Sequence, residues 1–85
     1  MLDQVHQILL RKVLNKVVLF APNVYAQSYA EIAEDQLSLK DWDKLEGQIP
    51  YIQSNLRNWR GEDSKQSKEI LAKCLELLAI TEKEE

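Results

Sequence analysis

The sequence predicts an all-α fold, an up-and-down antiparallel bundle of about four helical segments in one domain over residues 1–85. Apolar residues recur every three or four positions through most of the chain, which is the spacing of helices with one buried side. Short connections marked by proline, glycine or a capping residue separate these segments. Since no segment alternates as a strand does, we expect helices packed on helices.

The first two helices are expected over residues 2–20 and 24–39. Pro22 lacks an amide hydrogen and disfavours helix at the preceding residue, so it separates them, and Asn23 is expected to cap the second. The apolar stripe of the first helix comprises Leu2, Val5, Leu9, Val13, Val17 and Phe20. The stripe of the second comprises Tyr25, Tyr29, Ile32, Ala33 and Leu37. The outer charges are positive on the first helix (Arg11, Lys12, Lys16) and negative on the second (Glu31, Glu34, Asp35).

The N-terminal part of the chain also shares features with a secretion signal. Positive residues precede the run VVLFA, and residues 24–26 loosely follow a cleavage pattern, although Tyr25 fits it poorly. The apolar run 13–21 is too short to span a bilayer. The sequence leaves open whether residues 1–22 pack on the bundle, bind a partner or derive from a targeting segment.

The third and fourth helices are expected over residues 41–60 and 63–81. Pro50 interrupts the hydrogen bonding of the third, at ~3 kcal/mol unless the helix bends, so we expect either a kink there or two short helices joined near Gln48. Gly61 is expected to end this helix, and Asp63 to cap the last one. The residues expected to hold the bundle together are Trp42, Leu45, Ile49, Leu56, Leu75 and Leu78.

Composition excludes several classes of function. His6 and Cys74 are the sole histidine and cysteine, so the sequence offers no disulfide within the chain, no cysteine-based metal site and no histidine-dependent catalytic set. Acidic residues near Asp41 are explained by the dipole at a helix N-terminus. A net charge of −3 with mixed signs disfavours nucleic acid as the main partner. We expect neither enzymatic activity nor a cofactor, a metal or a small-molecule substrate.

The candidate contact surface is the most basic part of the second half of the chain. Tryptophan and arginine are enriched among residues that dominate protein–protein binding, and lysines reinforce an attraction to acidic partners. The predicted docking residues are Arg57, Trp59, Arg60, Lys65 and Lys68. Trp59 also falls on the inner stripe of its helix, which favours core packing, and it serves docking if a bundle this small leaves it partly exposed. The sequence therefore predicts docking on another protein rather than chemistry.

Residues 29–81 resemble the PsbQ-like family, the helical-bundle extrinsic proteins of photosynthetic complexes. The resemblance rests on Leu39-Lys40-Asp41-Trp42, on Leu56-Arg57 at the end of the following apolar helix, on the charged stretch 62–69, and on the closing helix through Leu78. It implies a non-catalytic subunit in the thylakoid lumen or on the lumenal face of the membrane. Such a subunit docks on photosystem II and stabilises the oxygen-evolving complex.

A second resemblance points to another class of protein. The sequence Asp41-Trp42-Asp43-Lys44-Leu45 is similar to the corresponding helix of FliT-type flagellar export chaperones. This alternative implies a small cytoplasmic protein that holds a client helix in an apolar groove.

Overall fold

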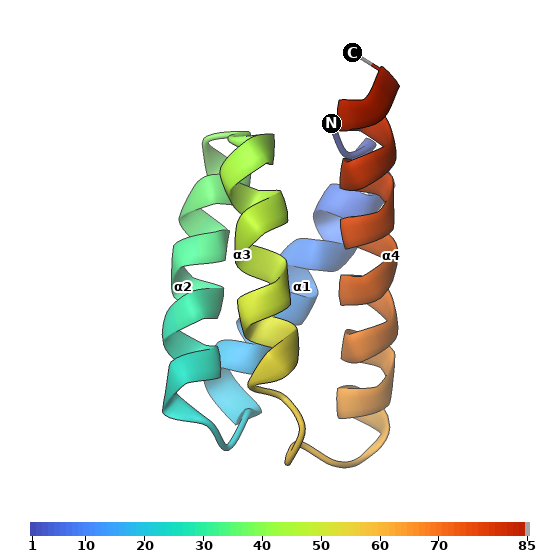
Figure 1. Cartoon of the computed structure of the whole chain (residues 1–85). Helices are drawn as coiled ribbons and strands as arrows, with labels where there is room; N and C mark the ends of the chain where they lie inside the picture. Colours follow the sequence, from blue (N-terminus) through green and yellow to red (C-terminus); the bar gives the residue numbers. More distant parts are fainter. Residues whose placement is uncertain (85) are drawn as a thin grey trace.

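The computed structural model describes residues 1–84 of the chain, and the side chains of residues 1–80. Four helices follow one another: α1 (Gln4–Phe20), α2 (Val24–Ser38), α3 (Trp42–Ser54) and α4 (Glu62–Glu84). They run alternately down and up (Figure 1), and the described residues contain no strand. The predicted all-α, up-and-down bundle is confirmed.

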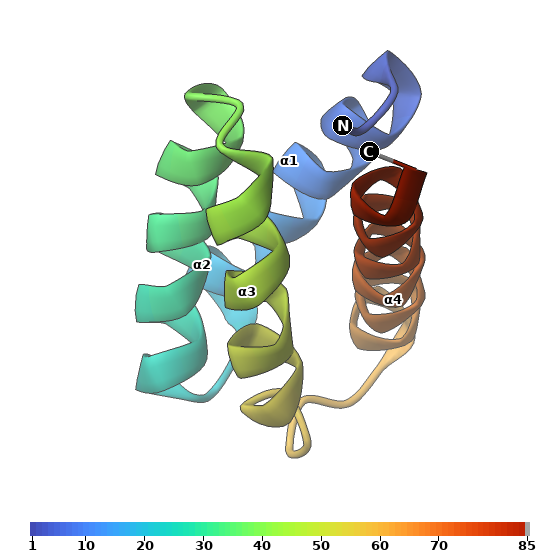
Figure 2. The ribbon, with the colours of Figure 1, turned by 45° about the horizontal axis from the view of Figure 1, so that its top comes forward.

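The helices surround one apolar core. α1 packs against α2 and α4, and α3 packs against the same two helices. α1 runs obliquely from beside the C-terminal end of α4 to the N-terminal end of α2 (Figures 1 and 2). The largest fully buried side chains are Leu2, Leu10, Leu14, Val17, Leu37, Leu45, Ile49, Ile52, Leu56, Leu71, Cys74 and Leu78. The N-terminal helix is thus part of the bundle core.

The expected apolar stripes of the first two helices are partly wrong. Val5 and Phe20 on α1, and Tyr25 and Ile32 on α2, are exposed. The buried side of α2 carries Ala26, Ala30, Ala33 and Leu37. Small alanine side chains let α2 lie close to its neighbours, whereas the tyrosine rings on the same helix are too large for that side and point outward or to the border.

The first three helices begin at side-chain caps. The Asp3 carboxylate accepts a hydrogen bond from the backbone nitrogen of His6 (2.8 Å), and His6 Nδ1 lies 2.8 Å from Asp3 Oδ2. The backbone hydrogen bond, followed by the side-chain one, lowers the pKa of Asp3. The expected caps Asn23 and Asp41 are both observed, Asp41 accepting from the backbone of Lys44 at 3.4 Å.

The third helix ends earlier than expected. α3 continues through Gly47 and Pro50 without interruption and ends at Ser54 rather than residue 60. Ser54 Oγ donates to the carbonyl of Pro50 (3.0 Å), and Asn55 Nδ2 donates to the carbonyl of Tyr51 (2.8 Å). These side chains take up carbonyls of the last turn, which offers the backbone an alternative to further helix. The alternative of two short helices joined near Gln48 is wrong, and the expected kink at Pro50 stays a prediction.

The fourth helix also differs at both ends. It begins at Glu62, directly after Gly61, whose φ of 106° places it in the left-handed region that favours glycine. Asp63 is therefore inside α4 rather than its cap, and it pairs instead with Lys16 of α1 at 3.1 Å. The helix continues to Glu84 instead of ending near Thr81.

The buried side of α4 carries one residue per turn. These residues are Ser64, Ser67, Leu71, Cys74 and Leu78. Burial raises the pKa of the Cys74 thiol to about 11, so the thiol is protonated near neutral pH and is a poor nucleophile. Cys74 is thus a structural residue of the core.

Candidate docking surface

Two buried anchors shape the connection between α3 and α4, residues 55–61, here called the basic loop. Leu56 is fully buried and Trp59 is 7% exposed, so both point into the core. Backbone hydrogen bonds from Leu56 to Gln53 (3.2 Å) and from Trp59 to Leu56 (3.1 Å) keep the loop turned on itself. Because the anchors point inward, Arg57 and Arg60 are exposed.

The carbonyl of Trp59 fixes the loop to the start of α4. It accepts a hydrogen bond from the hydroxyl of Ser64 at 2.6 Å and a second from Nζ of Lys68 at 2.9 Å. Ser64 is buried and Lys68 half-buried. Lys68, predicted as a docking residue, is thus engaged in holding the loop. The exposed arginines consequently project from a well-anchored backbone.

The structure brings most of the predicted docking residues together. A hollow of about 240 Å³ is lined by Trp59, Arg60, Gly61, Ser64, Lys65 and Lys68. Arg57 lies outside this hollow, on the exposed side of the loop. Trp59 is the one predicted docking residue whose side chain the structure places in the core.

The two tryptophans differ in burial, Trp59 being the more buried. Trp42, predicted to be a core residue, is half-buried and packs against the core, as does Leu75. The other residues predicted to hold the bundle together are fully or almost fully buried: Leu45, Ile49, Leu56 and Leu78.

A second feature, the connection between α1 and α2, was not predicted as a site. Residues 19–25, here called the apolar turn, expose four large apolar side chains by 61–68%: Leu19, Phe20, Val24 and Tyr25. Ala21 is buried, and its carbonyl accepts a hydrogen bond from Gln27 Nε2 at 2.7 Å. Asn23 accepts from the backbone nitrogens of Tyr25 and Ala26. The turn is therefore fixed although its apolar side chains face outward.

The apolar turn and the basic loop lie at the same end of the bundle (Figure 1). Asn23 Nδ2 is 3.4 Å from Asn55 Oδ1, which joins the two connections directly. The two segments are together called the docking end. It combines exposed aromatic and aliphatic side chains with the two arginines of the loop.

The sequence contains a signal for the apolar turn. Apolar residues continue on both sides of Pro22, in VVLFAPNVY, although the proline breaks the helix between them. Residues on opposite sides of such a break do not share one helical stripe, so some of them must leave the core. Periodicity within a single helix does not show this.

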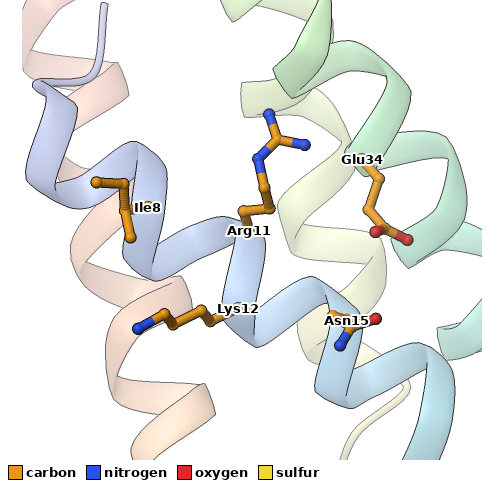
Figure 3. Close-up of a pocket in the computed structure, with 5 residues that line it drawn as sticks. All are labelled: Ile8, Arg11, Lys12, Asn15 and Glu34. Atoms are coloured by element: carbon orange, nitrogen blue, oxygen red, sulfur yellow. The ribbon is translucent and has the colours of Figure 1, made fainter.

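A larger groove lies between α1 and α2, with a volume of about 440 Å³. Ile8, Arg11, Lys12 and Asn15 line it along α1, and Glu34 faces them from α2 (Figure 3). Arg11 Nη1 lies 3.3 Å from the hydroxyl of Ser38. Ile8 is the one apolar residue in this set.

Other kinds of site find little support in the described part of the chain. No group of three or more His, Cys, Asp or Glu side chains among these residues is placed to hold a metal ion. None of the helices, over the residues described, combines the length and apolar character that crossing a membrane requires.

Comparison with known proteins adds no relative to this description. No family model, no curated protein and no solved structure matches the chain.

Proposed function

We propose that this chain is a non-catalytic accessory subunit that docks on a larger protein complex through its docking end. The observation that carries the proposal is the exposure of Leu19, Phe20, Val24 and Tyr25 in one fixed turn. Such side chains add nothing to the core, and contiguous exposed apolar groups are typical of interaction sites. Because the turn is already ordered, binding loses less conformational entropy than it would with a mobile segment.

The charges beside the turn indicate the chemistry of the partner. Arg57 and Arg60 are exposed, and the ion pairs among described side chains do not include either of them. Arginine forms paired hydrogen bonds with carboxylates and stacks on aromatic rings. The docking end therefore fits an apolar depression bordered by Asp or Glu side chains, with the apolar groups supplying affinity and the arginines orientation.

The complex that we propose is photosystem II or a related photosynthetic assembly. This step is supported by the resemblance of residues 29–81 to the PsbQ-like family, together with the helical bundle that such a subunit requires. The proposed location is the lumenal face of the thylakoid membrane. There the chain would stabilise the oxygen-evolving complex as a protein contact, without supplying ligands to its metals.

The alternative of a cytoplasmic FliT-like export chaperone has less support. It requires an apolar groove for a client helix, and the groove between α1 and α2 is lined mainly by polar and charged side chains.

A capture experiment tests the proposed function. The tagged chain would be incubated with extract of its native cells, crosslinked, and the bound proteins identified by mass spectrometry. We expect subunits of a photosynthetic complex, with recovery reduced about tenfold or more by Phe20→Ser combined with Arg57→Ala and Arg60→Ala. Leu39→Ser is the matched control, since Leu39 is 79% exposed in the connection at the opposite end of the bundle. Recovery of flagellar export proteins, or equal recovery by the triple variant, would contradict the proposal.

A further inference from the structure

Charges of opposite sign are separated onto two neighbouring helices. α1 contains Arg11, Lys12 and Lys16 and no Asp or Glu, whereas α2 contains Glu31, Glu34 and Asp35 and no Lys or Arg. Glu31 and Asp35 are one helical turn apart, as are Lys12 and Lys16, of which Lys16 pairs with Asp63 of α4. The outer face of this helix pair therefore has a positive side and a negative side.

These charges do not neutralise one another within the chain. The ion pairs among the side chains of residues 1–80 are His6–Asp3, Lys16–Asp63 and Lys44–Asp41, and none of them joins α1 to α2. Arg11 instead lies against the hydroxyl of Ser38. Lys12 points away from Glu34, to the side of α1 that faces α4 (Figure 3). Lys12, Glu31 and Asp35 are exposed and available to another molecule.

An apolar side chain accompanies the charges at the groove. Ile8 is 51% exposed and lines the groove between the two helices. An isolated charged face needs no such residues. Apolar groups between charges of both signs are instead the composition of a protein–protein interface, in which apolar contact supplies affinity and charge sets register.

Such a face can pack against the same face of a second copy around a two-fold axis. In a symmetric dimer the same patch is used by both copies, so it must be self-complementary. When a second copy is turned by 180° about an axis that runs along the groove, roughly parallel to the helices, its α2 lies over the first α1 and its α1 over the first α2. Each positive helix then meets a negative helix, and the groove residues of both copies meet at the axis.

We propose that the outer face of α1 and α2 is a homodimer interface, in which α1 of each copy packs on α2 of the other. The occupant is a second copy because the two charge sets are complementary to each other and to no single-sign partner: a uniformly acidic surface would be repelled by α2, and a uniformly basic one by α1. The inference does not rest on the proposed docking function, since Arg57 and Arg60 take no part in it.

A charge-swap experiment tests this interface. Analytical ultracentrifugation of the full chain should show a concentration-dependent dimer that weakens as salt screens the charges. Arg11→Glu with Lys12→Glu makes both helices negative, and Glu31→Lys with Asp35→Lys makes both positive. Each double variant should weaken self-association about tenfold or more, because like charges then face each other. An equimolar mixture of the two should restore dimers, now as heterodimers, which native mass spectrometry distinguishes by mass.

The controls separate this interface from general charge and from folding. All four substituted positions are exposed, so circular dichroism should show unchanged helicity. Lys44→Glu with Lys73→Glu alters net charge as much as the first variant but on α3 and α4, and it should leave the dimer intact. A wild-type chain that stays monomeric at ~0.5 mM would overturn the proposal, as would dimers unaffected by either swap or a mixture that fails to restore association.

Discussion

The two connections at the docking end place their large apolar side chains in opposite ways. Both join antiparallel helices, and both contain apolar residues. The basic loop turns Leu56 and Trp59 into the core and leaves arginines outside. The apolar turn buries only the small Ala21 and leaves Leu19, Phe20, Val24 and Tyr25 in solvent.

The buried apolar side chains of the loop serve folding, whereas the exposed ones of the turn suit docking. The apolar groups of the loop contribute to the free energy of unfolding, because they leave water when the chain folds. The exposed groups of the turn make little such contribution in the free chain, so contact with another molecule is the function they suit. Substitutions of these side chains should therefore change the free energy of unfolding strongly in the loop and little in the turn.

The largest effect is expected for Trp59→Ala. Removing an almost fully buried indole leaves a cavity and should lower the free energy of unfolding by about 3–5 kcal/mol, a large part of the stability of a small domain. Trp42→Ala, at a half-buried position, should cost clearly less. Urea denaturation followed by circular dichroism measures both. Equal losses of unfolding free energy for the two variants would contradict the different burial of the two tryptophans.

Ser64→Ala should have the next largest effect. It removes the 2.6 Å hydrogen bond to the carbonyl of Trp59 inside the bundle, which should cost about 1–3 kcal/mol. Ser54→Ala is the control, because its hydrogen bonds are exposed. Thermal denaturation of the two variants gives the comparison, and a Ser64→Ala chain as stable as wild type would show that the loop is not held by this contact.

Asn23→Ala tests whether the apolar turn is ordered by its cap. The side chain bonds two backbone nitrogens at the start of α2 and also reaches Asn55. Its loss should lower stability by roughly 1 kcal/mol. Hydrogen exchange should show faster opening of the first turn of α2, and unchanged protection there would mean that the turn is fixed by other contacts.

The smallest effect is expected for Phe20→Ser. This side chain is 62% exposed, so the free energy of unfolding should stay within about 0.5 kcal/mol of wild type, while partner binding falls. Denaturation of the free chain is the readout. A loss comparable to that of Trp59→Ala would place Phe20 in the fold rather than in docking.

Local sequence signals predict the fold well and the surface less well. Pro22, Asn23 and Asp41 mark helix boundaries through backbone chemistry, and these boundaries are observed within a residue or two. The end of α3 was missed because Leu56 and Trp59 continue the helical spacing even though the chain reaches the core there through a loop. Periodicity indicates which residues face inward on a helix, but it does not show that the helix has already ended.

Periodicity also fails to identify the exposed face of α2. Alanine and tyrosine stripes coexist on this helix, and hydrophobicity favours the tyrosines as the buried side. The buried side of α2 is the alanine side. Which side is buried depends on how the neighbouring helices pack in the assembled bundle, and not on the segment alone. Residues placed outside by this choice, such as Tyr25, could not be identified from one helix alone.

The most direct test of the central claim is co-sedimentation of the purified chain with photosystem II-enriched thylakoid membranes. Saturable binding by wild type and by Leu39→Ser is predicted, with affinity lowered about tenfold or more by Phe20→Ser combined with Arg57→Ala and Arg60→Ala. Circular dichroism should confirm that the triple variant is as helical as wild type. Equal binding by the triple variant, or no saturable binding by wild type, would contradict the assignment of the docking end to this complex.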